Sequence, residues 1–101
     1  MANDIVMQMV IEHTEPMVTG TSANGTWTRQ TYVGKTLGYA PKVIRFEVWG
    51  GDRIVRLNIE KGKVYNIYLD IFSSTYKGRD EQEHWTNNIR CYDARLVENN
   101  K

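Results

Sequence analysis

The sequence predicts an all-β domain, a five-stranded barrel with one short helical turn between its third and fourth strands. Three observations lead to this prediction. Apolar and polar residues alternate with period two over five stretches, as in strands with one buried face. Glycine, proline and asparagine lie between these stretches, where turns are expected. Residues 53–58 instead have apolar side chains three positions apart, which is typical of a helix.

Length and composition are those of one globular domain. The chain has 101 residues, of which 41% are hydrophobic and 25% are charged. We expect a single domain over residues 1–101, with a core over about residues 5–97 and short polar termini. No apolar run approaches the roughly 20 residues of a membrane helix, and the N-terminus lacks the pattern of a signal peptide. The single cysteine, Cys91, fits a reducing compartment, so we expect a cytoplasmic protein.

The first two strands are separated by turn signals. The first strand is predicted over residues 4–12. Pro16 should interrupt it, because proline donates no hydrogen bond to a neighbouring strand. Residues 19–25 are expected to form a loop with an Asn-Gly hairpin signal at its end. A hairpin therefore leads into the second strand, residues 26–36.

The third strand, residues 42–50, has two different faces. The apolar face is expected in the core and consists of Ile44, Phe46 and Val48. The opposite face combines charge with an aromatic ring and consists of Val43, Arg45, Glu47 and Trp49. This composition is unusual for a strand face that only contacts water, so this face is a candidate binding surface.

The remaining elements complete the barrel. Asp52 is placed to cap the helical turn. The fourth strand is predicted over residues 63–73, with Tyr65, Ile67, Leu69 and Ile71 pointing inward. A charged loop over residues 76–83 precedes the fifth strand, residues 84–97. This element order is that of an OB-fold, a small Greek-key barrel, although other barrels, such as SH3-like ones, share the strand count.

Charge is distributed unevenly along the chain, although the net charge is only +1. Residues 1–28 hold three acidic residues and no lysine or arginine, whereas residues 29–79 hold 10 basic and 4 acidic residues. If the basic residues of the middle segment share one face, they could hold a phosphate backbone. The alternative interpretation is that solvated strands simply carry mixed charge.

Several short motifs follow one another in an order that resembles bacterial single-stranded DNA-binding proteins. The motifs are Gly25-Thr26-Trp27, Phe46-Glu47-Val48-Trp49-Gly50, Lys61-Gly62, Tyr76-Lys77-Gly78-Arg79 and Trp85-Thr86. The sequence is more similar still to an uncharacterised family of small bacterial OB-fold proteins with comparable motifs. The resemblance covers roughly residues 5–97. It implies an OB-fold that binds single-stranded DNA in replication, recombination or repair.

The resemblance implies a site in which bases stack on aromatic rings while lysine and arginine contact phosphates. The candidate stacking residues are Trp27, Trp49, Tyr76 and Trp85, with Tyr32, Tyr39 and Tyr92 as secondary candidates. The candidate phosphate contacts are Arg29, Lys35, Arg45, Arg53, Lys77, Arg79 and Arg90. The alternative for each aromatic residue is core packing, which we favour for Tyr32 and Tyr65. Trp27 and Trp85 could instead close the ends of the barrel.

Catalytic and metal-binding chemistry finds little support in the sequence. His13 and His84 are far apart, Cys91 has no cysteine partner, and no spacing matches a zinc or phosphate-loop motif. We therefore expect a protein that is not an enzyme and has no cofactor or metal.

The expected partner is single-stranded DNA. RNA is an alternative, because stacking and phosphate contacts do not distinguish the two unless the 2′-hydroxyl is read. A homo-oligomer is expected, because small OB-folds often need neighbours to build a long binding track, and no membrane partner is expected. The alternative function is an OB-fold protein-interaction or assembly module whose aromatic residues pack against another subunit.

Overall fold

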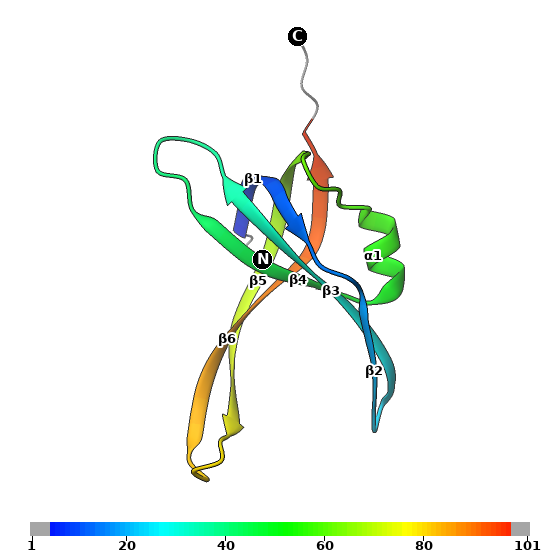
Figure 1. Ribbon diagram of the computed structural model, residues 1–101, viewed down its shortest axis with the longest axis vertical. Helices are drawn as coiled ribbons and strands as arrows, with labels where there is room; N and C mark the ends of the chain where they lie inside the picture. Colours follow the sequence, from blue (N-terminus) through cyan, green and yellow to red (C-terminus); the bar gives the residue numbers. More distant parts are fainter. Residues whose placement is uncertain (1–4, 98–101) are drawn as a thin grey trace.

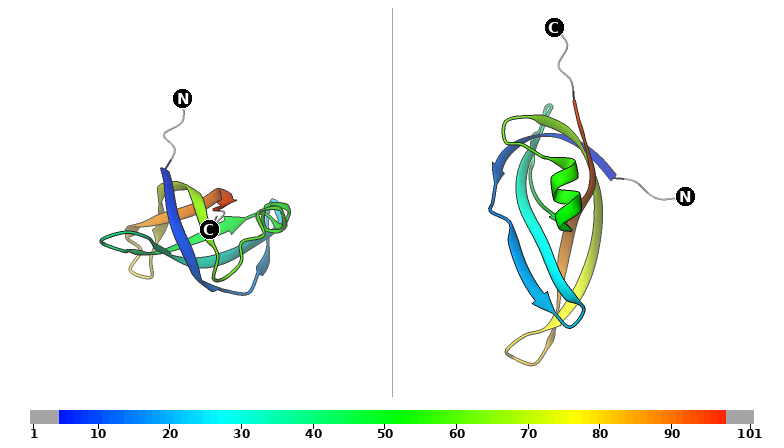
Figure 2. Two further views of the ribbon diagram at one scale, coloured as in Figure 1. Left: turned by 90° about the horizontal axis from the view of Figure 1, so that it is seen from above. Right: turned by 90° about the vertical axis from the view of Figure 1, so that its right-hand side faces the viewer.

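The computed structural model describes residues 5–97, which form six strands and one helix (Figure 1). The strands are β1 (Ile5–Thr14), β2 (Val18–Ser22), β3 (Gly25–Thr36), β4 (Val43–Trp49), β5 (Val64–Lys77) and β6 (Glu83–Leu96), and the helix is α1 (Gly51–Leu57). Hydrogen-bonded neighbours follow the order β1-β5-β6-β4-β3-β2, and β1 also pairs with β3. The additional pairing closes the sheet into a barrel (Figure 2). Asp4 of the first predicted strand and the polar end at 98–101 lie outside the described residues.

The topology is that of the predicted OB-fold. Neighbouring strands are antiparallel except β4 and β6, which meet in parallel at Glu47 and Arg90. β1 and β2 both pair with β3, one before and one after Pro16, so together they occupy the place of the first strand and six strand segments form the five-stranded order. α1 connects β4 to β5, which is the position of the predicted helical turn.

The core contains most of the strand side chains that the period-two patterns placed inward, together with the inner side of α1. It consists of Met9, Ile11, Tyr32, Phe46, Val48, Ile54, Leu57, Ile59, Tyr65, Ile67, Leu69 and Cys91. The ring of Tyr32 stacks on Phe46 with centroids 5.5 Å apart, and its hydroxyl donates to Gln30. Tyr32 and Tyr65 are therefore core residues, as we expected, and neither is exposed for stacking on a base.

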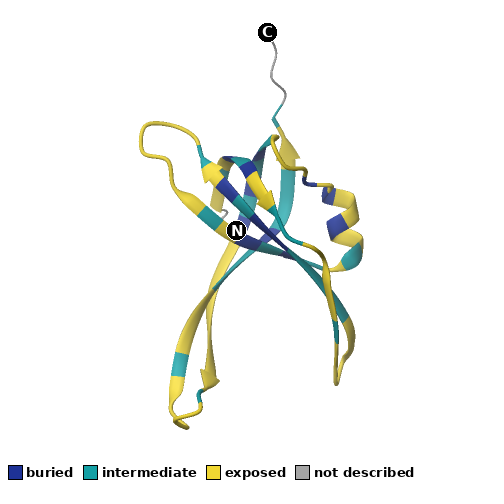
Figure 3. Ribbon diagram, in the orientation of Figure 1, coloured by how far each residue is buried: buried dark blue, intermediate teal, exposed yellow. Residues whose placement is uncertain are grey.

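Two hairpins extend beyond the barrel toward the same end of the molecule (Figures 1 and 2). We call residues 18–29 the β2–β3 arm and residues 70–90 the β5–β6 arm. The molecule is 55 Å long with a radius of gyration of 15.4 Å, whereas a compact domain of this length has about 13 Å. The two arms account for the elongation, and Figure 3 shows that their surfaces are largely exposed.

The sequence predictions are wrong mainly in these arms. The loop expected over residues 19–25 is mostly strand, because β2 pairs with β3 up to Ser22 and Gly25. The loop expected over residues 76–83 shrinks to 78–82, because β5 and β6 remain paired as far as Lys77 and Glu83.

Two single-residue predictions are also wrong. Ile71 is 47% exposed rather than inward, because β5 has left the barrel at this point and no core lies beneath it. Asp52 does not cap α1. The N-cap is Gly50, which has φ 101° and makes no side-chain cap hydrogen bond, while Asp52 lies in the first turn. Within residues 5–97, no helix is long and apolar enough to cross a membrane.

Candidate nucleic-acid interface

Two tryptophans and two arginines meet on the outer surface of β3, β4 and β6. Arg29 lies directly opposite Trp49 in the β3–β4 ladder, and Trp27 projects from the same face of β3. The rings of Trp27 and Trp49 have centroids 5.4 Å apart and are tilted by 42°. The guanidinium of Arg29 lies 5.8 Å and 6.0 Å from these two centroids. Together with Arg90, we call these residues the Trp–Arg cluster.

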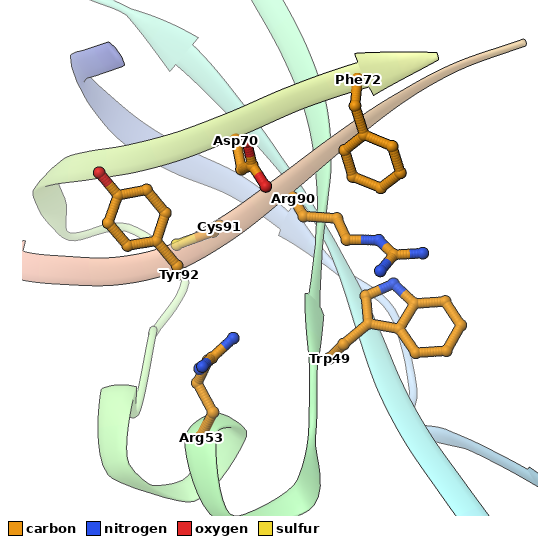
Figure 4. A pocket seen from close by; sticks show the side chains of 7 residues that line it. All are labelled: Trp49, Arg53, Asp70, Phe72, Arg90, Cys91 and Tyr92. Atoms are coloured by element: carbon orange, nitrogen blue, oxygen red, sulfur yellow. The ribbon is translucent and has the colours of Figure 1, made fainter. Parts of the chain in front are cut away.

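Arg90 joins the cluster from the β5–β6 side of the barrel. In the parallel contact between β4 and β6, Arg90 lies beside Glu47. Glu47 is two residues before Trp49 and therefore on the same face of β4. Its guanidinium carbon lies 4.4 Å from the ring centroid of Trp49 and 4.9 Å from that of Phe72 (Figure 4). A cation over an aromatic face is attracted by the ring quadrupole. Arg90 therefore links Trp49 on the barrel to Phe72 on the arm.

Glu47 holds two members of the cluster in place. One carboxylate oxygen accepts a hydrogen bond from Nε1 of Trp49 at 2.9 Å, and the other lies 3.4 Å from a guanidinium nitrogen of Arg29. These side chains are only partly exposed, so solvent screens the charges less than on an open surface. Period-two spacing places Glu47 on the same face of β4 as Trp49, and this is the sequence signal for its supporting role.

Gly20 of the β2–β3 arm provides the surface on which Trp27 lies. The two residues are directly opposite each other in the β2–β3 ladder. A Cβ atom at position 20 would collide with the six-membered part of the Trp27 ring. The glycine therefore lets the ring approach the backbone of β2 closely.

A pocket of about 390 Å³ opens next to the Trp–Arg cluster (Figure 4). It is lined by Trp49, Arg53, Asp70, Phe72, Arg90, Cys91 and Tyr92. Arg53 reaches the pocket from α1, and Asp70 reaches it from β5. Cys91 is buried, and burial raises the pKa of its thiol to about 12. The pocket therefore combines one carboxylate, two guanidinium groups, aromatic rings and a neutral thiol.

The β5–β6 arm carries a second group of candidate residues. Tyr76 stacks on His84 across the ladder with centroids 5.4 Å apart, and Lys77 and Arg79 are exposed near the tip. Within this turn, hydrogen bonds from the Gln82 backbone N–H and from His84 lower the pKa of the Asp80 carboxyl.

Four further predicted residues lie away from the cluster, and one of them is Tyr39, which is exposed on the loop at residues 37–42. Trp85 pairs with Thr75, so it projects from the face of the arm opposite Tyr76. It is 74% exposed, and the idea that it closes a barrel end is wrong. Lys35 and Arg45 are exposed on the outer face of β3 and β4, toward the loop at residues 37–42 rather than toward the arms.

The structure thus brings one set of predicted residues together and leaves others apart. The cluster and its adjoining pocket contain Trp27, Arg29, Trp49, Arg53, Arg90 and Tyr92. Asp70 and Phe72 were missed, because their place beside Arg90 depends on the β5–β6 register rather than on local sequence. Across residues 5–97, no group of three or more histidine, cysteine or acidic side chains could hold a metal ion.

The class of this protein is an OB-fold barrel. Its outer β3–β4 face carries aromatic and basic side chains between two projecting hairpins. The chain belongs to the DUF3127 family, a domain of unknown function, which residues 7–95 match. Among solved structures, it is similar to the S. cerevisiae mitochondrial single-stranded DNA-binding protein Rim1. The TM-score is 0.65, with 17% sequence identity over 97% of each chain. This likeness is one of fold, and no curated protein matches the sequence.

Proposed function

We propose that this protein binds single-stranded DNA with little sequence dependence and acts in DNA replication, recombination or repair. The observation that carries the proposal is the Trp–Arg cluster, which lies on the outer β3–β4 surface beside both arms. In OB-folds this surface and the two flanking hairpin loops are where oligonucleotides bind. The shared fold with Rim1, named as a single-stranded DNA-binding protein, supports the proposal.

The cluster has the chemistry that a single strand requires. Each base that stacks on an aromatic side chain contributes about 1–3 kcal/mol, whatever its identity. The partly exposed rings of Trp27 and Trp49 provide two such surfaces. Arg29 lies against both rings, where its guanidinium can reach phosphates of a strand stacked there. Lys77 and Arg79 would contact the strand further along the β5–β6 arm.

The test is a titration of oligo-dT followed by tryptophan fluorescence at low salt. We expect quenching of the wild-type protein and weaker binding of Trp49→Ala by about tenfold, because one stacking surface is removed. Tyr39→Ala is the matched control, since Tyr39 is a fully exposed aromatic residue on the loop at 37–42. No quenching of the wild type, or equal affinity for wild type and Trp49→Ala, would contradict the proposal. Parallel titration with oligo-U decides between DNA and RNA.

One observation favours a second function as an assembly module. Ile71 and Trp85 are both well exposed and project from the same face of the β5–β6 arm, opposite the face of Tyr76. Burying these side chains against another subunit would be favourable, and it would give the homo-oligomer that we propose. Light scattering of wild type and Trp85→Ser tests this role. A protein that forms oligomers through Trp85 and shows no salt-dependent DNA binding would support the assembly function instead.

A further inference from the structure

We propose that the pocket beside Trp49 is a selective site for one guanine base of the bound strand. This inference rests on the proposed single-strand binding and adds a base preference at one position to an otherwise sequence-tolerant surface. The pocket is continuous with the Trp–Arg cluster through Trp49 and Arg90. When one base of the strand stacks on the cluster, the next base can therefore reach the pocket. Its volume of about 390 Å³ lies within the roughly 300–1,000 Å³ usual for small-molecule sites.

Two opposite charges line this pocket. Asp70 comes from β5 and Arg53 from α1, on different sides of the pocket (Figure 4). Both are exposed, and among the described residues neither makes a side-chain hydrogen bond or an ion pair. Such groups are available to a ligand that offers donors on one edge and acceptors on another.

The carboxylate of Asp70 decides which ligand fits. A carboxylate only accepts hydrogen bonds, and it repels a phosphate by like charge. A base that presents two adjacent N–H donors is therefore preferred. Guanine does so with N1–H and its 2-amino group. Cytosine and adenine place an acceptor nitrogen beside their amino group, and thymine has one N–H between two carbonyl oxygens.

Arg53 complements the adjoining edge of the same base. The oxygen O6 and the nitrogen N7 of guanine are both acceptors, and the guanidinium group matches this pair with two parallel N–H donors. Trp49 lines the side of the pocket, and the guanidinium of Arg90 lies over its ring. Cys91, which also lines the pocket, has a neutral thiol and adds no competing charge.

The experiment measures the binding of labelled oligo-dT of about 15 nucleotides by fluorescence anisotropy. The central thymine is kept or replaced by guanine, adenine, cytosine or hypoxanthine. We expect the guanine oligonucleotide to bind at least about fivefold more tightly than all-thymine, which is the lower end for one bidentate base contact. Hypoxanthine lacks the 2-amino group and should fall between the two.

Two matched substitutions assign the preference to the pocket. Asp70→Asn keeps the shape of an exposed side chain and removes the carboxylate, so the ratio of guanine to thymine affinity should fall to about one. Asp52→Asn makes the same chemical change at an exposed position of α1 outside the pocket and should keep the ratio.

The outcomes separate this inference from the proposed function. Equal binding of all oligonucleotides, or adenine bound as well as guanine, would overturn the guanine site while single-strand binding stands. A guanine preference that survives Asp70→Asn would also overturn it. A wild-type protein that binds none of the oligonucleotides would refute the proposed function, and the guanine site with it.

Discussion

The strands β5 and β6 run through both the barrel and the β5–β6 arm, but their side chains have different surroundings in the two regions. Within the barrel, Tyr65, Ile67 and Leu69 of β5 are at most 4% exposed, whereas Ile71, next in the same alternation, is 47% exposed. The pairing of β5 with β6 continues without a core beneath it. Packing of buried side chains therefore stabilises the barrel, whereas the arm is stabilised mainly by the backbone hydrogen bonds between β5 and β6. Side chains of the arm are thus free to contact a ligand.

The largest expected difference between the two regions is in folding stability. Phe46→Ala in the barrel should lower the free energy of unfolding by about 3–5 kcal/mol, because it removes a buried ring and leaves a cavity. Ile71→Ala in the arm should change it by no more than about 0.5 kcal/mol. Urea denaturation followed by circular dichroism measures both values. A large decrease for Ile71→Ala would show that the arm is packed against another surface.

A smaller effect should distinguish the arm by its role in binding. The double change Lys77→Ala with Arg79→Ala should reduce the slope of log affinity against log salt by about 0.7 for each phosphate that is no longer neutralised. The free energy of unfolding should stay nearly constant, since both side chains are exposed. Lys42→Ala with Lys61→Ala removes the same charge from exposed positions outside the arms and is the control. Equal slopes for the two double variants would exclude the arm tip from the binding surface.

The third expected effect appears only at alkaline pH and concerns the barrel alone. Burial raises the pKa of the Cys91 thiol from 9.0 to about 12. Above pH 9 the unfolded chain loses this proton while the folded protein keeps it, so the stabilisation is complete below pH 9 and is lost progressively toward pH 12. One pH unit above its ordinary pKa, the loss is about 1.4 kcal/mol. Denaturation of wild type and Cys91→Ala across this range measures the difference, and parallel pH profiles for the two proteins would contradict the assignment.

The sequence predicted the barrel well because local alternation and packing agree there. Phe46 and Val48 are buried as expected, and Ile54 and Leu57 form the inner side of α1. The arms were predicted poorly because the length of a strand depends on its partner. Residues 19–22 look like a loop in isolation and become β2 only because β3 offers backbone groups opposite them.

The site was predicted in part for the same reason. Period two correctly placed Trp49 on the outer face of β4, and it placed Arg45 on the same face, but Arg45 does not contact Trp49 in the cluster. The actual neighbours of Trp49 are Arg29, fixed by the β3–β4 register, and Arg90, brought by the parallel contact with β6. Contacts between strands distant in sequence are not contained in the pattern of any single strand. The cytoplasmic location and the homo-oligomer stay predictions.

The most direct test of the account uses a protein in which Trp49 is the only tryptophan, made by Trp27→Phe and Trp85→Phe. These changes keep an aromatic ring at both positions. If bases stack on the Trp–Arg cluster, saturating oligo-dT at low salt should quench the Trp49 fluorescence, and added salt should restore it. Unchanged Trp49 fluorescence, under conditions where anisotropy shows the oligonucleotide bound, would contradict the central claim that the strand lies on this cluster.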